Sequence, residues 1–374
     1  MKIGIQTLQL NTNYGGILQA YALQTVLQRM GHDASVITKF SIFAFPLWMY
    51  PLALGFRLVK KYILGQKNIV IFNVKKRKEE AVIVRQHTQR FIDTYINKLE
   101  CERFISLPEN CVDAIVVGSD QVWRPRYFGK KIIADAYLEF ARGWDIKRLS
   151  YAASFGTAEW EYSESQTAKC KELIAKFDAV SVREESAVGL CKDHFGVEAQ
   201  HLLDPTMLLS KEDYIELVEK NATPKSAGDL MVYILDDTAD KQAVVDAVAK
   251  IKGLTPFRSN SKAESGNAPL EERIQPPLEQ WLRGFMDAEF VVADSFHACV
   301  FSIIFNKPFI ALCNKARGAS RFESLLKIFG LEDRLIETSQ ELTAEHMSDI
   351  DYQQVNKIKE TWVAKSMAFL SKLN

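Results

Sequence analysis

The sequence VVADSFHACVFSIIFNKPFIAL, residues Val291–Leu312, carries the strongest local indication of the fold. Phe290–Ala293 and Phe309–Leu312 are short apolar runs typical of buried parallel strands, and Phe296–Phe305 has the length of a helix. This order predicts a βαβ unit whose functional loop follows the first strand. His297 then lies in the first turn of the helix, where unpaired backbone N–H groups favour phosphates and carboxylates. We interpret His297 as an active-site residue, with a structural core histidine as the alternative.

The same alternation of apolar strands and polar loops extends in both directions from this unit. Further strands are predicted at Ile3–Gln6, Ala34–Thr38, Asp113–Gly118, Leu149–Phe155, Ala179–Val182 and Leu230–Leu235. Helices are predicted at Ile17–Met30, Lys75–Lys98, Glu279–Met286 and Tyr352–Leu373. The pattern predicts an α/β protein with two Rossmann-like, doubly wound domains that face each other across a cleft.

The expected division places the first domain at residues 1–208, with an insert around 41–100, and the second at 209–345. The remaining helix, 346–374, could pack back on the first domain. The length of 374 residues suits two domains of ordinary size.

The charge balance argues against nucleic acid as a partner. Lys plus Arg and Asp plus Glu both number 47, so the net charge is zero. Proteins that bind the nucleic-acid backbone are usually strongly basic. Any bound anion must therefore be held by a local cluster of donors.

The six cysteines form no CxxC pair and no cluster with zinc-ligand spacing, so we expect no metal site and no disulfide framework. The amino terminus begins with a strand-like run and lacks the pattern of a signal peptide. Both features favour a cytoplasmic protein.

The segment Ser41–Val59 is rich in apolar and aromatic residues and is followed by Lys60 and Lys61. Pro46 and Pro51 argue against a spanning helix. We favour a lid or connecting segment packed on the first domain. The alternative is peripheral membrane contact through residues 41–61, as an enzyme working on a lipid-linked sugar would need.

Two motifs follow predicted strands of the first half. In GSDQVWR, Gly118–Arg124, Asp120 could bind or deprotonate a sugar hydroxyl, or could cap a helix. Trp123 could stack on a sugar, although core packing is the alternative that we favour. In SVREES, Ser181–Ser186, Arg183 offers a planar fork for carboxylate or phosphate. A salt bridge from Arg183 to Glu184 or Glu185 is the structural alternative.

Two further motifs suggest ligand contacts. NKARGASRF, residues 314–322, gathers Lys315, Arg317 and Arg321 after a strand and indicates an anion site, with a solvated basic turn as the alternative. NTNYGGILQAYAL, residues 11–23, places two glycines before a helix, and Asn13 and Gln19 there could bind hydroxyls.

Taken in order, NYGGILQAYALQ, GSDQVW, YAASFG, SVREES, LDPT and the SFHA helix resemble the polysaccharide pyruvyl transferase family. The resemblance covers about residues 3–326. It implies a glycosyltransferase-B-like fold and transfer of pyruvate from phosphoenolpyruvate to two hydroxyls of one sugar, as in exopolysaccharide synthesis. The family's histidine matches His297 and its arginine matches Arg183.

One position departs from the family pattern. Many members carry an arginine two residues before the histidine, where this chain has Ser295. We expect Arg317 or Arg321 to supply the missing cation, with His297 as general acid or phosphate ligand and Asp120 as base or acceptor ligand.

The expected contacts divide between donor and acceptor. The donor, phosphoenolpyruvate, would contact Ser295, Lys315, Arg317 and Arg321. No cofactor is expected. A sugar acceptor, which could be lipid-linked, would contact Asn13, Tyr14, Gly15, Gly16, Gln19, Ser119, Trp123 and Ser154.

Two other functions stay open. A nucleotide-sugar-dependent glycosyltransferase would have the same fold, because fold does not fix function. A non-catalytic sugar-binding or assembly subunit would explain the missing arginine at Ser295.

Overall fold

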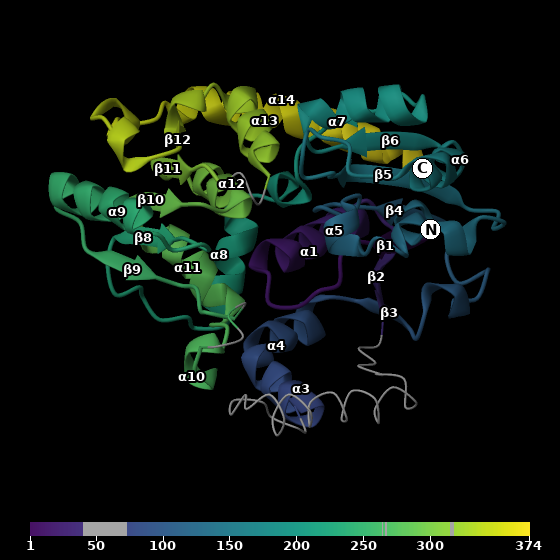
Figure 1. The fold of residues 1–374 in the computed structure, drawn as a ribbon, viewed down its shortest axis with the longest axis horizontal. Coiled ribbons are helices and arrows are strands. Elements are labelled where there is room, and N and C mark those ends of the chain that lie inside the picture. The colour runs from purple at the N-terminus through teal and green to yellow at the C-terminus, as the bar shows by residue number, and fades with distance from the viewer. Residues whose placement is uncertain (40–72, 264, 266–267, 315–317) are drawn as a thin grey trace, which may run out of the picture.

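The protein is built on two parallel β-sheets, which Figure 1 shows side by side. The structure, a computed structural model, describes residues 1–39, 73–263, 265, 268–314 and 318–374. The first domain, as we use the term below, is built on a seven-stranded sheet and the second on a five-stranded sheet. The expected α/β architecture is therefore confirmed.

The seven-stranded sheet has the order β3-β2-β1-β4-β5-β6-β7. Its strands are β1 (Lys2–Gln6), β2 (Asp33–Lys39), β3 (Lys98–Cys101), β4 (Ala114–Val117), β5 (Lys147–Ala153), β6 (Ala179–Val182) and β7 (Gln200–His201). The five-stranded sheet has the order β12-β11-β10-β8-β9. Its strands are β8 (Leu230–Tyr233), β9 (Pro256–Arg258), β10 (Phe290–Ala293), β11 (Phe309–Leu312) and β12 (Leu335–Ile336).

Helices cover the faces of both sheets. Those of the first domain are α1 (Tyr14–Arg29), α3 (Asn73–Val84), α4 (Gln86–Tyr95), α5 (Pro125–Phe128), α6 (Glu164–Ile174) and α7 (Glu185–Leu190). They are followed by α8 (Lys211–Lys220), α9 (Ala239–Lys252), α10 (Leu270–Arg273), α11 (Leu278–Asp287), α12 (Phe296–Ile304), α13 (Ala319–Phe329) and α14 (Tyr352–Leu370).

The central strands β4, β6, β8, β10 and β11 are buried at every position. This burial explains their apolar sequences, because a parallel strand covered by helices on both faces has no polar side. Polar side chains appear directly after these strands, so the carboxyl ends of the strands carry the chemistry.

One predicted element is wrong. The charged segment Lys75–Lys98 was expected to form one helix, but the chain breaks at Arg85 between α3 and α4, and Lys98 begins β3. Phe91 of α4 packs against Tyr21 of α1, with 5.8 Å between ring centroids. β3 pairs with β2 through the register Val36↔Lys98, so tertiary pairing overrides the helical composition there.

The two domains share one hydrophobic core. Tyr14, at the start of α1, is fully buried and donates a hydrogen bond of 2.7 Å to the Pro276 carbonyl of the second domain. Its ring lies 5.6 Å from Trp281 of α11 and 6.4 Å from Tyr233 of β8. The start of α1 is thus fixed against the second domain.

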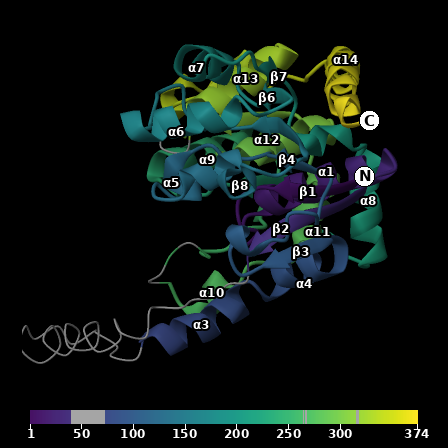
Figure 2. The same ribbon diagram turned by 90° about the vertical axis from the view of Figure 1, so that its right-hand side faces the viewer.

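Two further connections join the domains. α14 runs along the top of the molecule from the second domain to the first (Figure 1). Tyr352, at its start, binds the Lys307 carbonyl of the second domain, and Lys147 of β5 binds the carbonyl of Leu373, 2.9 Å away. On the opposite side, α3 lies against α10, where Arg273 forms an ion pair of 3.1 Å with Glu80 (Figure 2).

Among the described residues, no helix is long and apolar enough to cross a membrane. The segment 41–61, for which a lid or connecting segment and membrane contact were considered, lies outside the described residues.

Truncation of Tyr14 should weaken the contact between the domains. We expect Tyr14→Ala to lower the free energy of unfolding by about 3–5 kcal/mol, as for other buried aromatic residues. Tyr14→Phe should cost only about 0.5–1.5 kcal/mol, because it removes the hydrogen bond alone. Urea unfolding followed by tryptophan fluorescence measures both. A cost below about 1 kcal/mol for Tyr14→Ala would contradict this role.

Candidate active site

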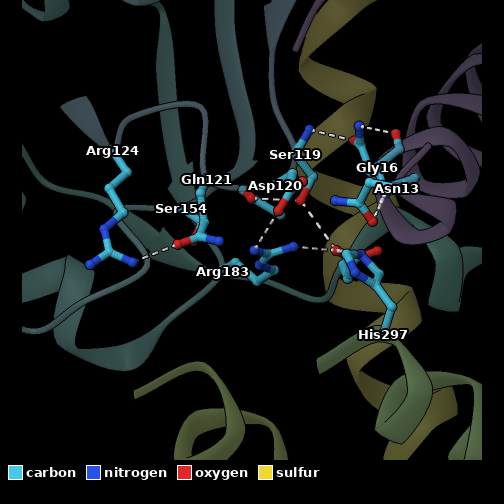
Figure 3. Close-up of polar contacts among 12 residues, drawn as sticks. Asn13, Gly16, Ser119, Asp120, Gln121, Arg124, Ser154, Arg183 and His297 are labelled. Carbon is cyan, nitrogen blue, oxygen red and sulfur yellow. Dashed lines mark hydrogen bonds and ion pairs between the residues drawn. The ribbon is translucent and has the colours of Figure 1, made fainter. Parts of the chain in front are cut away.

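Three loops of the first domain converge on a buried ionic cluster. Asp120 follows β4, Arg183 follows β6, and Asp204 follows β7. Arg183 Nη1 lies 2.8 Å from Asp204 Oδ2, and Arg183 Nη2 lies 3.3 Å from Asp120 Oδ1. The three side chains are at most 5% exposed, and Figure 3 shows the Arg183 side chain directed toward Asp120.

Asp204 is the most tightly held member of the cluster. Its Oδ1 accepts hydrogen bonds from the backbone N–H (3.0 Å) and the hydroxyl (2.8 Å) of Thr206. Its Oδ2 also accepts a hydrogen bond of 3.3 Å from Ser119 Oγ and lies 3.5 Å from His297 Nε2. Burial acts to raise the pKa of Asp204, but the charges of His297 and Arg183 outweigh it and hold the pKa well below its usual value.

Asp120 is also held as a carboxylate. Its backbone has φ 60°, a left-handed conformation that turns the chain after β4. Burial opposes ionisation, but the charges of Arg183, His297 and Arg321 lower the pKa of Asp120 below its usual value. A carboxylate with a lowered pKa is a weak base. The environment therefore does not favour the expected role of Asp120 as general base.

A third carboxylate, Glu184, also lies beside Arg183. Its Oε1 accepts a short hydrogen bond from Ser154 Oγ and lies 3.8 Å from Arg183 Nε. Burial raises the pKa of Glu184, and Arg183 and Ser154 offset the increase only in part. Arg321, from α13 of the second domain, completes the cluster. Burial and the charge of Arg183 lower its pKa to about 10.

Phe296 lies between the two arginines. Its ring centroid is 4.5 Å from the Arg183 guanidinium carbon and 5.5 Å from that of Arg321. Stacking on an aromatic face stabilises a guanidinium that is removed from water. The first turn of α12 thus supports cations from both domains.

His297, the next residue of that turn, faces a cavity between the domains. The cavity has a volume of about 430 Å³ and is lined by Asn13 and Gly15 of the first domain and by Ser295 and His297 of the second. Gly15 packs directly on the imidazole, because a Cβ atom there would lie 2.0 Å from His297 Nδ1. The amino-terminal end of α12 therefore faces a space that could hold a small anion.

The structure brings the three expected catalytic residues together. Asp120, Arg183 and His297 come from separate motifs and lie in one cluster around Asp204. Arg183 forms ion pairs with three carboxylates and is 4% exposed, so it organises the cluster. It is not an open anion clamp in this conformation.

The structure describes only two of the four residues that were expected to contact phosphoenolpyruvate. Ser295 precedes α12 as its N-cap and lines the interdomain cavity. Arg321 lies in the buried cluster, 6% exposed. Lys315 and Arg317 lie outside the described residues.

Several expected acceptor residues build the site from within, because their side chains are buried and their polar atoms have partners in the protein. Gln19 Oε1 accepts from the Ser119 backbone N–H at 2.8 Å, and Ser119 and Ser154 bind carboxylates of the cluster. Gly16 donates its backbone N–H to Asn13 Oδ1 at the start of α1. Among these residues, Asn13 and Gly15 face the cavity.

Neither Tyr14 nor Trp123 is accessible to a ligand in this structure, and for Trp123 this agrees with core packing, the alternative that we favoured. Trp123 is 0% exposed, stacks on Tyr137 at 5.0 Å, and donates its indole N–H to the Ala136 carbonyl. Tyr14 is equally buried in the interdomain core. Both aromatic residues stabilise the fold.

Sequence reasoning assigned no role to Asp204 and considered Glu184 only as a salt-bridge partner. Asp204 belongs to LDPT, and Glu184 follows Arg183 in SVREES. For Glu184 the available signal was its place after the apolar strand β6, the same signal that identified Arg183, whereas Asp204 follows only the apolar pair Leu202 and Leu203.

Solved structures of low sequence identity are similar to this chain, and one of them, with a TM-score above 0.5, shares the fold. The UDP-L-rhamnose complex of Arabidopsis thaliana UGT89C1 is 8% identical, with a TM-score of 0.51 over 98% of this chain and 97% of that chain. UDP-GlcNAc 2-epimerase from Neisseria meningitidis bound to UDP-GlcNAc is 10% identical, with a TM-score of 0.45 over 100% of this chain and 94% of that chain. No curated protein sequence matches the chain.

Two facing parallel α/β domains, with the site between them, define a protein of the glycosyltransferase-B type of fold. The sequence model of the polysaccharide pyruvyl transferase family matches residues 13–315. The chain belongs to this family and is a transferase.

A methyl group at Gly15 should displace His297. The added Cβ of Gly15→Ala would lie 2.0 Å from Nδ1, so the imidazole has to move. We expect about a 10²-fold loss of turnover, the typical effect of a misplaced catalytic group, with unfolding little changed. Gly189→Ala on α7 is the matched control, because its Cβ meets no atom within 4 Å. Equal turnover by Gly15→Ala and Gly189→Ala would show that turnover does not depend on the packing of Gly15 against His297.

Neutralising Asp204 should destabilise the protein in a pH-dependent manner. Asp204→Asn leaves Arg183 without its closest counter-charge, and we expect a cost of about 3–5 kcal/mol at pH 7. The pKa of Asp204 is lower in the folded protein than in the unfolded chain. The difference in unfolding free energy between wild type and Asp204→Asn is therefore complete above about pH 4 and decreases as the pH falls further.

Urea unfolding of both proteins at pH 7, 5 and 3 measures this difference. Asp93→Asn, whose carboxylate is 51% exposed, is the control and should cost at most about 1 kcal/mol. A difference between wild type and Asp204→Asn that is the same at pH 7 and pH 3 would refute the assignment.

Proposed function

We propose that the protein transfers pyruvate from phosphoenolpyruvate to two hydroxyls of one sugar, with formation of a ketal and release of phosphate. The observation that carries this proposal is the position of His297. It lies at the amino-terminal end of a helix, faces the interdomain cavity, and is backed by the Asp204 carboxylate. The start of the helix would bind the anionic phosphoenolpyruvate, and His297 would supply a proton at the same place.

The reaction requires one proton delivery and two additions to the same carbon. A proton is added to the methylene carbon of the enol, and a sugar hydroxyl adds to the neighbouring carbon and loses its proton. The bond from that carbon to the phosphate oxygen then breaks, and a second hydroxyl takes the place of phosphate and loses its proton. No oxidant or reductant is consumed.

The residues at the cavity suit these steps. We assign His297 as the group that protonates the methylene carbon, since positioned acids typically contribute about 10²–10⁴-fold to a rate. The N–H groups at the start of α12 and the side chain of Ser295 would hold the carboxylate or phosphate. Asp204 would orient the imidazole of His297, and Arg183 would keep Asp204 in place.

Ser295 stands where many family members have arginine, and the structure suggests two sources of compensating charge. Arg321 reaches the cluster beside Phe296 from α13. Arg258 lines the cavity itself, although it also forms an ion pair of 2.9 Å with Asp237. Both belong to the second domain, as would be expected for a donor site there.

Removal of His297 should abolish transfer without loss of the fold. For His297→Ala we expect kcat to fall by about 10²–10⁴-fold, measured as phosphate released from phosphoenolpyruvate with a panel of oligosaccharide acceptors. His346→Ala, on the short helical turn Glu345–Met347, is the control and should remain active.

Calorimetric titration separates this function from its alternatives. Saturable binding of phosphoenolpyruvate, weakened in His297→Ala, would support pyruvyl transfer. Binding of uridine diphosphate but not of phosphoenolpyruvate would instead support a nucleotide-sugar-dependent glycosyltransferase. Full phosphate release by His297→Ala would remove His297 from the mechanism.

A further inference from the structure

A second cavity lies in the first domain, apart from the interdomain cavity. It has a volume of about 420 Å³ and lies at the carboxyl ends of β1, β2 and β3, closed by α4 and α5. Ligands of open α/β sheets bind in crevices at this edge. None of the residues assigned above to donor or acceptor lines it.

Two basic side chains that form no ion pair within the described residues distinguish this cavity. Lys39, at the end of β2, and Arg85, between α3 and α4, both line it. Within the described parts of the chain, neither side chain forms an ion pair with a carboxylate. Lys39 Nζ instead lies 4.4 Å from the centroid of Phe104. Both side chains are half-buried, so they are open to an anion bound in the cavity.

Lys98 lines the same cavity but is neutralised. Its Nζ lies 2.6 Å from Asp93 Oδ1 and 3.7 Å from Glu100 Oε1. Lys98 is therefore not available to pair with a bound anion. Glu100, the acidic residue in the lining of this cavity, is paired with Lys98.

The rest of the lining suits the ring of a sugar. Phe104, Tyr127 and Phe128 provide aromatic surface, and the Phe104 and Phe128 rings are 6.4 Å apart. Apolar walls with a few polar groups are typical of small-molecule sites.

The cavity adjoins the ionic cluster. Thr7 lines it and donates a hydrogen bond of 3.1 Å to the carbonyl of Ser119, the residue before Asp120. Tyr127, on the opposite wall, is close enough to Arg321 to influence its pKa. A molecule in this cavity would thus lie against the first-domain side of the site.

We propose that the first-domain cavity binds the acceptor as a sugar that carries a phosphate group, with Lys39 and Arg85 holding the phosphate. The aromatic walls pack against the sugar ring. A neutral sugar would form no ion pair with either cation. This assignment rests on the proposed pyruvyl transfer, because it gives the acceptor of that reaction its chemical class.

Binding of glycosyl phosphates tests the proposal without requiring turnover. The probes are glucose, galactose and mannose 1-phosphates beside the free hexoses, titrated calorimetrically into the full-length protein. We expect at least one hexose 1-phosphate to bind at least about tenfold more tightly than its hexose, the effect of one hydrogen bond to a charged group.

Variants locate the phosphate. Lys39→Gln and Arg85→Gln should each weaken hexose 1-phosphate binding by at least about tenfold, and Lys39→Arg should restore part of it. Lys98→Gln removes the same charge from the same wall but should change the dissociation constant less than about twofold, as for a paired surface charge. His297→Ala should leave this binding intact.

The source of the phosphate is distinguished by nanodiscs that contain a mannosyl polyprenyl phosphate. Binding of both nanodisc and soluble probe, each weakened by Lys39→Gln, shows that the phosphate itself is recognised. Binding of the nanodisc alone, again weakened by Lys39→Gln, assigns the phosphate to a lipid-linked sugar.

Two results would overturn the proposal. One is that neither nanodisc nor any hexose 1-phosphate binds more tightly than the free hexoses. The other is that binding is lost in His297→Ala and unchanged in Lys39→Gln, which would place the anion in the interdomain cavity. Failure of pyruvyl transfer itself would appear differently, as glycosyl phosphate binding without phosphate release from phosphoenolpyruvate.

Discussion

The ion pair between Arg183 and Asp204 is the interaction on which the site depends. Both side chains are removed from water, so each ion is stable only while the other is in place. Asp204 also faces His297, which belongs to the other domain. The position of the proposed proton donor is thus set by a charge of the first domain, and the site exists only while both domains keep their present contact.

Much of the fold could be predicted from the sequence because the strands are buried on both faces. Strands β6, β10 and β11 begin and end where the apolar runs do. The segment Lys75–Lys98 could not be predicted in the same way. Its composition suits an exposed helix, whereas the pairing of Lys98–Cys101 with β2 depends on residues some 60 positions earlier in the chain.

Some members of the ionic cluster were predictable from the sequence, but Asp204 and the contacts within the cluster were not. Polar residues after apolar strands identified Asp120 and Arg183, because parallel strands bring their carboxyl ends to one edge. That Arg183 would bind Asp204 and not Glu185 depends on the geometry of three loops, which no local pattern contains. Trp123 shows the same limit, since a tryptophan beside a functional loop can face a ligand or the core.

The course of α14 has a consequence for biosynthesis. Its last turns complete the packing of the first domain, where Phe369 lies 6.3 Å from Tyr151 and Lys147 binds the carbonyl of Leu373. These partners are separated by the whole second domain in the sequence. During translation, when amino-terminal domains usually fold first, the first domain emerges with this surface uncovered. Its core is closed only after the second domain has been made, so maturation of the two halves is coupled.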